Sequence, residues 1–344
     1  MRRDSLVKLP RALVEPVPNP DARFIMGIDG GATKTLAVVL DLRTKALHFA
    51  HGGPSNEDAV GVAAAVHALL QVADEALARA GIAHHALATA VLAVAGTDTG
   101  AIARHVRATR TEDWIVVNDV VAAWAAATGA EPGVGAISGT GSNVFGVGPH
   151  GRPWRVGGWG HLLGDEGGGY WLGIGSIRAA LRDRDGSGPP TALSNAAVEF
   201  YSAESIEALA ALVYSKPLTK GEIAAFATEA AKIAQRGDAV ARELYERGGA
   251  ELGEQIAVVI RETGLQDAED PFPVGLIGSA FKAGPLLVDP LAAIVREAAK
   301  HARVSVVEMA PVGGSLLLAA RACGRRLERR ELSGLLDAAL EQQP

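Results

Sequence analysis

Two similar strand–turn–strand units, one near the start of the chain and one near its middle, constrain the fold more than any other feature of this sequence. The first runs from Gly27 to Leu40 and the second from Gly135 to Val147. In each, an apolar stretch leads into a turn rich in Gly and Ser or Thr and then into a second apolar stretch. Short apolar runs bounded by such turns are typical of buried β-strands. The repetition therefore predicts two related lobes, each built around a sheet.

Strand-like and helix-like segments alternate along most of the chain. The strand-like runs are Phe24–Asp29, Leu36–Asp41, Ala46–Ala50, Ala90–Ala95, Trp114–Asn118, Val134–Ser138, Asn143–Val147, Val274–Ile277 and Val304–Val307. The helical stretches include residues 60–80, 101–108, 120–127, 291–299 and 314–322. This alternation favours an α/β fold.

A break at residues 129–133, Gly-Ala-Glu-Pro-Gly, separates the two units. We therefore expect an N-terminal α/β lobe over residues 24–132 and a C-terminal α/β lobe over residues 133–324. Within the second lobe, residues 195–264 are expected to form a helical insert, because apolar or small residues recur every four positions from Val240 to Ile260. The insert is interpreted as scaffold.

The two ends of the chain differ from these lobes. Residues 1–23 contain four prolines and no apolar run, and we expect them to be a flexible extension. Residues 325–344 are expected to form a C-terminal helix, opened by four arginines that are interpreted as a solvated face rather than as a site for an anionic partner.

Charge and cysteine content exclude several classes of protein. The formal net charge is −6 over 344 residues, which argues against nucleic acid as a partner. Gly, Pro or charged residues interrupt every apolar segment before about 18 residues, so a membrane span is not expected. The lone cysteine, Cys323, cannot form an intrachain disulfide or supply a Cys-rich metal site, and it is interpreted as a small buried side chain. The cytoplasm is the expected compartment.

The first turn, Asp29-Gly-Gly-Ala-Thr-Lys-Thr35, follows an apolar strand directly. Gly30 and Gly31 allow the backbone to approach an anion closely, and the hydroxyls of Thr33 and Thr35 are candidate donors to phosphate oxygens. Asp29 is a candidate Mg²⁺ residue through water, because hard cations prefer oxygen ligands. A plain hairpin turn is the alternative interpretation. The spacing is not that of a Walker loop.

Two further segments have similar chemistry. The second turn, Ile137-Ser-Gly-Thr-Gly-Ser-Asn143, offers backbone N–H groups and hydroxyls without a charged side chain nearby. Two such turns on two strand pairs suggest a nucleotide held from both sides. The segment Gly278-Ser-Ala-Phe-Lys-Ala-Gly284 follows another apolar strand and offers small residues against which a flat purine could lie.

Three polar segments remain. They are Gly53-Pro-Ser-Asn56, the pair Asn118-Asp119, and the Gly-rich stretch 157–169, which contains Trp159, His161, Asp165 and Glu166. Asp119 stands at a strand end before a helix, where it could act as a general base or simply cap the helix. Trp beside carboxylates and amides suits a polyhydroxylated sugar, which needs a flat apolar face and hydrogen-bond acceptors.

In their order along the chain, these segments resemble the motifs of the N-acetylglucosamine kinase family. That family belongs to the BadF/BadG/BcrA/BcrD-type group of the sugar kinase, Hsp70 and actin superfamily. The matching segments are Asp29–Thr35, Ala95-Gly-Thr-Asp98, Asn118-Asp119, Ile137–Asn143, Gly157–His161 with Gly164–Gly167, Gly278-Ser279 and Pro311–Ser315.

The resemblance implies a set of site residues. ATP would be bound at the turns, by Gly30, Gly31, Thr33, Lys34, Thr140, Gly141, Gly278 and Ser279, with Asp29 near its Mg²⁺. The sugar would be bound by Asn56, Asp119, Ser142, Asn143, Gly158, Trp159, Gly160 and Asp165. Asp119 would be the catalytic base. Relatives that hold an iron–sulfur cluster or a Cys-rich zinc motif are poor matches, because Cys323 stands alone.

The resemblance also implies a fold and a reaction. Two ribonuclease-H-like lobes of the actin-like ATPase type would enclose the active site in a cleft between them. ATP and Mg²⁺ would serve phosphorylation of the 6-hydroxyl of N-acetylglucosamine, with a small-molecule sugar and ATP as the partners. Glucosamine or N-acetylmuramic acid remains an alternative substrate, and an ATPase switch or sensor remains an alternative function. The sequence leaves open whether the chain forms a homodimer.

Overall fold

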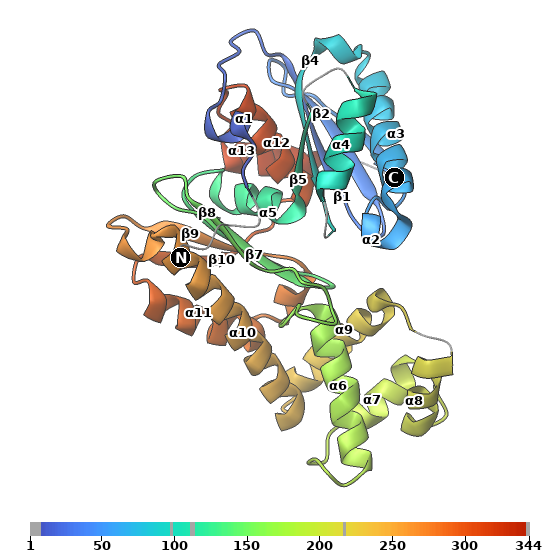
Figure 1. Cartoon of the computed structure of the whole chain (residues 1–344). Coiled ribbons are helices and arrows are strands. Elements are labelled where there is room, and N and C mark those ends of the chain that lie inside the picture. The colour runs from blue at the N-terminus through green and yellow to red at the C-terminus, as the bar shows by residue number, and fades with distance from the viewer. Residues whose placement is uncertain (1–7, 97–98, 111–113, 216–217, 342–344) are drawn as a thin grey trace.

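A computed structural model describes residues 8–96, 99–110, 114–215 and 218–341 and contains two five-stranded sheets (Figure 1). The first sheet has the order β3 (Leu47–Gly52), β2 (Thr35–Asp41), β1 (Phe24–Gly30), β4 (Leu87–Val94) and β5 (Ile115–Asn118). The second has the order β8 (Pro153–Gly157), β7 (Ser142–Val147), β6 (Gly133–Ser138), β9 (Phe272–Ile277) and β10 (Ala302–Val306).

The two sheets share one topology. In each, the first three strands form an antiparallel meander, and the fourth and fifth run parallel to the first strand. The two strand–turn–strand units recognised in the sequence are the β1–β2 and β6–β7 hairpins, and they occupy equivalent positions. The predicted α/β fold with two related lobes is confirmed.

Helices and sheets stack in layers. Helices α3 (Val62–Ala80) and α4 (Thr99–Thr109) cover the outer face of the first sheet, with the short α2 (Glu57–Val60) before them. Helices α5 (Asp119–Thr128) and α12 (Pro311–Ala322) lie between the two sheets. Helices α10 (Ala239–Thr263) and α11 (Pro285–Ala298) cover the outer side of the second sheet (Figure 1).

The two central helices are exchanged between the lobes. Helix α5 follows the last strand of the first sheet but packs mainly on β6 and β9 of the second. Helix α12 follows the last strand of the second sheet but packs on β1 and β4 of the first. The helices also pack on each other, so closely that a Cβ atom on Gly314 would lie 1.9 Å from the carbonyl oxygen of Ala122. Only glycine fits this approach.

The remaining helices of the second lobe are α6 (Gly169–Arg184), α7 (Leu193–Phe200), α8 (Ile206–Ser215), α9 (Lys220–Gln235) and the short 3₁₀ helices at Leu265–Asp267 and Ser279–Ala283. A further 3₁₀ helix, His84–Ala86, directly precedes β4 of the first sheet. The predicted buried face of the helical insert lies on α10, where Leu244, Leu252, Ile256 and Ile260 are buried. This helix packs against β6, β7 and β8.

The chain ends pack more tightly than their sequence suggests. Residues 11–14 form a helical turn, α1 (Arg11–Val14), in which Leu13 is 1% exposed. Arg321 of α12 donates from Nε to the carbonyl oxygen of Leu13 over 2.7 Å. Helix α13 (Arg329–Leu340) lies in the expected C-terminal helix, and Arg329 donates to the carbonyl oxygen of Ala127 at the end of α5.

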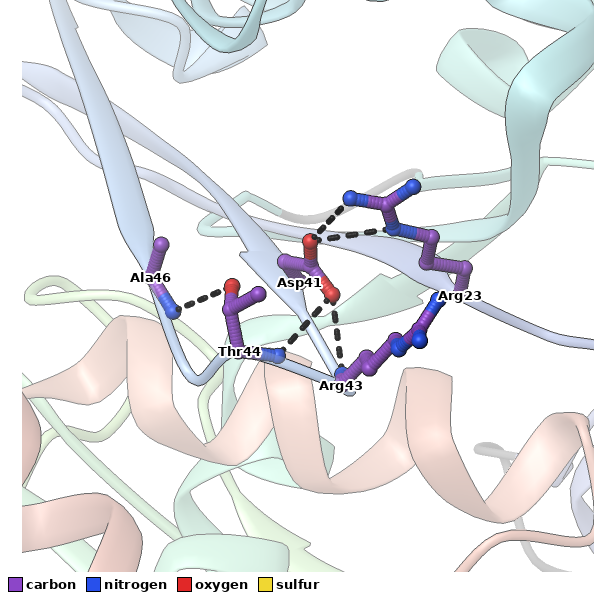
Figure 2. Close-up of polar contacts among 5 residues, drawn as sticks. All are labelled: Arg23, Asp41, Arg43, Thr44 and Ala46. Atoms are coloured by element: carbon purple, nitrogen blue, oxygen red, sulfur yellow. Dashed lines mark hydrogen bonds and ion pairs between the residues drawn. The ribbon is translucent and has the colours of Figure 1, made fainter.

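The β2–β3 turn is fixed by one carboxylate (Figure 2). Oδ1 of Asp41 accepts hydrogen bonds from the backbone N–H groups of Arg43 and Thr44, and Oδ2 accepts two from the guanidinium of Arg23. Burial alone would raise the pKa of Asp41, but these donors together lower it to about 2. The carboxylate thus ties the segment before β1 to the hairpin.

No helix in the described part of the chain combines the length and apolar character that a membrane span requires.

Candidate functional site

The turn between β1 and β2 is anchored to the loop that precedes α2. Thr35 is fully buried, and its hydroxyl donates to the carbonyl oxygen of Gly53 over 2.6 Å and contacts the Ser55 hydroxyl at 2.8 Å. The Thr35 hydroxyl is therefore occupied inside the protein, and the expectation that it donates to phosphate is wrong. Thr33 and Lys34 are exposed on the turn, whereas the backbone of Gly31 donates to the carbonyl oxygen of Lys34 and accepts from the N–H of Ser55.

A Cβ atom on Gly30 would lie 2.5 Å from Oγ of Ser55, so the close contact between turn and loop requires glycine there. The contact also holds Asn56 beside the first turn. Oδ1 of Asn56 accepts from the backbone N–H of Asp58 and caps α2. One of the two polar atoms of this predicted sugar residue is thus already engaged by the protein.

The carboxylates of Asp29, near the end of β1, and Asp119, directly after β5, interact electrostatically. Burial raises the pKa of Asp119 to about 7, and the negative charge of Asp29 adds to that rise. Burial also raises the pKa of Asp29 to about 6, against the opposing charge of Lys34. Paired carboxylates with raised pKa values are a feature of sites that move protons or bind cations. The predicted base and the predicted Mg²⁺ residue therefore belong to one site.

Asp119 is not the cap of α5. The N-cap is Asn118, whose Oδ1 accepts from the backbone N–H of Val120 over 3.3 Å. Asn118 also donates from Nδ2 to the carbonyl oxygen of Gly96. Because another residue caps the helix, the capping interpretation of Asp119 loses its basis. Thr97 and Asp98, part of the matching segment after β4, lie outside the described residues.

One predicted sugar residue of the second lobe, Asn143, is hydrogen-bonded to Asn118. Asn143 on β7 donates from Nδ2 to Oδ1 of Asn118 over 3.3 Å. Its own Oδ1 is buried and has no hydrogen-bond partner within the described ranges. Gly158 has a positive φ of 69°, and a Cβ there would lie 2.7 Å from the Asn143 amide. An orphaned buried acceptor of this kind fits a ligand hydroxyl.

The Gly-Asp-Glu-Gly stretch is folded back onto the second turn. Ser142 donates from Oγ to the carbonyl oxygen of Glu166, so its hydroxyl positions this stretch. Asp165 is buried with a positive φ of 61°, a conformation that Asp tolerates better than most residues. A Cβ on Gly141 would lie 2.5 Å from Oδ2 of Asp165. Burial raises the pKa of Asp165.

Trp159 and Gly160 are followed by an exposed apolar segment. Trp159 is 55% exposed, and the adjacent Leu162 and Leu163 are more than 80% exposed. Gly160 has a φ of 83°, which favours glycine. The ring of Trp159 is thus available to a ligand on the surface of the site.

Sequence reasoning missed Arg155 on β8. Its guanidinium lies 5.5 Å from the centre of the Trp159 ring and donates to the carbonyl oxygen of Gly158 over 3.2 Å. Its charge opposes the rise in the pKa of Asp119. There is little indication in the sequence of a role for Arg155, because a single Arg in an edge strand that begins with proline looks like an ordinary surface residue.

A pocket of about 470 Å³ lies beside the second turn. Thr140, Ser279 and Gly139 line it, as do Lys232 and Lys282. Gly278 has a φ of 122°, and a Cβ there would lie 2.2 Å from the carbonyl oxygen of Ser138, so this close crossing needs glycine. The pocket therefore joins the second turn to the predicted purine segment.

Helix α9, which belongs to the segment 195–264 interpreted as scaffold, forms another wall of this pocket. Several of the α9 residues that line the pocket are small, namely Gly221, Ala224, Thr228 and Ala231. Spacing of three or four residues puts these positions on one helical face. The same pattern also occurs where helices pack closely, which is why it gave no functional signal.

The start of α6 is fastened to the second turn. The backbone N–H groups of Gly169 and Tyr170 donate to the carbonyl oxygens of Gly139 and Thr140, at 2.7 and 2.9 Å. Ser138 also donates from Oγ to the carbonyl oxygen of Gly167. The pocket, the second turn and the Gly-rich stretch are therefore one connected structure.

Among the described residues there is no group of three or more His, Cys, Asp or Glu side chains placed to hold a metal ion.

The chain matches a known protein family and resembles individual known proteins, among them two amino-sugar kinases. The model of the BadF/BadG/BcrA/BcrD ATPase family matches residues 26–319. An N-acetylmuramic acid/N-acetylglucosamine kinase of Clostridium acetobutylicum is 31% identical over 261 residues, which is 71% of this chain and 82% of the relative. An N-acetyl-D-glucosamine kinase of Dictyostelium discoideum is 30% identical over 313 residues, covering 86% of this chain and 97% of the relative.

A crystal structure of a protein from Chromobacterium violaceum superposes with a TM-score of 0.69 and 26% identity. The superposition covers 87% of this chain and 100% of that chain.

Proposed function

The chain belongs to the BadF/BadG/BcrA/BcrD ATPase family, and from that premise we propose that it transfers the γ-phosphoryl group of ATP to the 6-hydroxyl of N-acetylglucosamine. Both curated relatives are amino-sugar kinases, and this chain is an ATP-dependent sugar kinase of the same kind. One observation carries the residue assignment. Asp119 interacts electrostatically with Asp29 and directly follows Asn118, which caps α5 and is hydrogen-bonded to Asn143.

Asp119 acts as the general base in this proposal. Its ionised carboxylate accepts the proton of the 6-hydroxyl as that oxygen attacks the γ-phosphorus in line, and ADP leaves. Backbone N–H groups of the two turns and the hydroxyls of Thr33 and Thr140 donate to the phosphate oxygens. In phosphoryl transfer, positioning and charge stabilisation supply most of the catalysis.

The donor set at the first turn fits Mg²⁺. Asp29 would hold the ion through water, because its carboxylate is a hard oxygen ligand next to a second negative charge. When bound, Mg²⁺ neutralises charge on the β- and γ-phosphates. The nucleoside would lie in the pocket between Ser279 and helix α9.

The sugar would lie against Trp159, with its hydroxyls on Asn143, Asp165 and Asn56. A sugar ring has an apolar face that stacks on an aromatic ring. The free Oδ1 of Asn143 accepts from one hydroxyl. Asn56 and Asn143 are neutral amides, which supports a neutral acetamido sugar over glucosamine, whose ammonium group would favour additional carboxylates.

N-acetylmuramic acid is a second candidate substrate, favoured by two observations. The Clostridium acetobutylicum relative is named for both sugars. Arg155, which the structure brings beside Trp159, supplies a cation that could meet the carboxylate of an acidic sugar. The same chemistry at the 6-hydroxyl applies to both substrates.

A cytoplasmic location fits the single cysteine and the need for ATP.

The deciding experiment measures ADP release with each of five sugars and with none. The sugars are N-acetylglucosamine, N-acetylmuramic acid, glucosamine, N-acetylmannosamine and glucose. We expect negligible release without sugar and the highest kcat/KM with N-acetylglucosamine. A higher kcat/KM for glucosamine would overturn the acetamido preference. ADP release that no sugar stimulates would instead favour an ATPase switch and overturn the kinase assignment.

A further inference from the structure

A second pocket opens on a different face of α6 from the pocket beside the second turn. It also measures about 470 Å³. Its walls come from α6, from the loop at Gly188 and Pro189 that follows α6, and from the first turns of α10. None of the residues expected to bind ATP, Mg²⁺ or sugar lines it. The pocket is therefore a separate feature of the helical part of the second lobe.

The floor of this second pocket is apolar and fixed by helix packing. Trp171 and Ile174 contribute from α6 and Leu244 from α10. At Gly175 the two helices approach so closely that a Cβ would lie 2.9 Å from Cδ1 of Leu244. Close packing of this kind holds the pocket walls at a constant separation.

Three arginines line the second pocket against a single carboxylate, that of Glu243. Arg178 and Arg182 come from successive turns of α6, and Arg247 comes from α10. Nη2 of Arg182 donates to the carbonyl oxygen of Ser187 over 3.0 Å, which holds this guanidinium at the pocket edge. Positive charge thus exceeds negative charge around an apolar floor.

None of these three guanidinium groups is neutralised by a carboxylate. Within the part of the chain that the structure describes, Arg178, Arg182 and Arg247 form no ion pair. Glu243 precedes Arg247 by four residues, a spacing at which Glu–Arg pairs often form on helices. The Arg247 guanidinium instead lies 5.0 Å from the centre of the Trp171 ring. The cation and the indole therefore form a common surface.

We propose that the second pocket binds a small molecule carrying a phosphate monoester on a ring. The guanidinium fork matches the oxygens of a phosphate and donates two parallel hydrogen bonds to it. Trp171 offers a flat apolar face to the ring that carries the phosphate. Phosphosugars and mononucleotides share this chemistry. The proposal goes beyond the kinase assignment and does not depend on it.

The two pockets lie on different faces of the same helices, α6 and α10, and have no lining residue in common. Leu172 and Tyr245 line the first pocket, and their sequence neighbours Trp171 and Leu244 line the second. A phosphate monoester could also enter the kinase site. The measurement therefore uses the protein saturated with a non-hydrolysable ATP analogue and N-acetylglucosamine.

The test is titration calorimetry with three probes, N-acetylglucosamine 6-phosphate, adenosine monophosphate and inorganic phosphate. We expect one of the two monoesters to bind with a stoichiometry of one and more tightly than inorganic phosphate. The double variant Arg178→Gln/Arg247→Gln should weaken that binding at least about tenfold, because charge-assisted hydrogen bonds are lost. Arg242→Gln is the matched control on α10, exposed and outside the pocket, and should leave the affinity unchanged.

Comparison of the two monoesters identifies the ligand source, a phosphosugar or a mononucleotide. Absence of saturable binding for both monoesters would overturn the proposal. So would equal affinities in the wild type and the double variant. If inorganic phosphate bound as tightly as the monoesters, the role given to Trp171 would be wrong. An unchanged thermal midpoint in the double variant confirms that it is folded, so lost binding is then due to the charges.

Discussion

Asp119 occupies the first turn of α5 while Asn118 performs the capping. The Asp119 side chain is therefore a partly buried carboxylate directly after a strand, and it is not the N-cap of the helix that follows. The neighbouring charge of Asp29 acts on it from another strand, and Arg155 acts on it from the second lobe. Sequence alone predicted Asp119 and Asp29 but not Arg155, because a cation that acts across two lobes leaves no local pattern.

The first prediction concerns the base. Asp119→Asn keeps the shape of the side chain but cannot accept a proton, so kcat should fall about 10²- to 10⁴-fold. Stability should change little, because the cap of α5 is on Asn118. Sugar affinity, measured by calorimetry, should persist. A folded variant that keeps more than about a tenth of the wild-type kcat would remove Asp119 from the role of base.

The second prediction concerns pH. A base must be ionised, and the pKa of Asp119 is raised to about 7, so kcat/KM should fall as the pH drops below that value. Arg155 opposes the rise, so Arg155→Gln should move this acid limb to higher pH. Arg155→Lys, which keeps the charge, should restore it. An acid limb that stays in place in Arg155→Gln would show that this cation does not act on the base.

At the scale of elements, most strands and the long helix α10 could be predicted because the sequence patterns that mark them lie within single short segments. Apolar runs between turns and a four-residue repeat are properties of short segments. Strand β8 was missed because Pro153 opens it and Arg155 interrupts its apolar pattern. The docking of α12 on the first sheet was missed because contact between residues almost 300 positions apart, such as Ser315 with Ile28, is not encoded in local periodicity.

The third prediction belongs to the β2–β3 hairpin. Asp41→Asn should lower the free energy of unfolding by about 1–3 kcal/mol at neutral pH, because four hydrogen bonds to an ionised group are weakened or lost (Figure 2). The folded-state pKa of about 2 lies below the ordinary value of 3.8. The stabilisation is therefore present above that ordinary value and disappears as the pH falls toward about 2.

Urea unfolding of wild type and Asp41→Asn at several pH values tests this prediction. The difference between them should shrink in acid. Asp21→Asn, an exposed change in the segment before β1, is the control and should have little effect. Equal stability of Asp41→Asn and wild type at neutral pH would contradict the role given to this carboxylate.

At the scale of the whole molecule, α5 and α12 form the layer on which both sheets rest. The apolar side chains of this layer include Trp124 from α5 and Leu316 from α12, and they meet Phe145 of the second sheet and Ile25 of the first. Relative movement of the lobes must therefore pass through the α5–α12 contact. A glycine marks the closest point of this contact, Gly314 against Ala122, and Gly135 of β6 allows a similarly close approach of the second sheet to Trp124 of α5.

The fourth prediction follows from this contact. Gly314→Ala should destabilise the protein by about 1–3 kcal/mol or more, because its Cβ would lie 1.9 Å from a backbone oxygen that has no room to move. Gly334→Ala on α13 is the control, since nothing lies within 4 Å of its Cβ position. That change should raise stability by about 0.5–1 kcal/mol through helix propensity. Thermal unfolding of both variants is the measurement, and two equal midpoints would refute the argument.

The exchange of α5 and α12 has a consequence for how such a chain could have arisen. Each half supplies the helix that the sheet of the other half needs, so a half by itself would leave an apolar sheet face open to water. The smallest self-sufficient assembly of one half is therefore a pair of copies that trade their final helices, in the manner of a domain-swapped dimer. On this view the present chain is such a dimer joined end to end, in which the fusion made the two copies free to diverge.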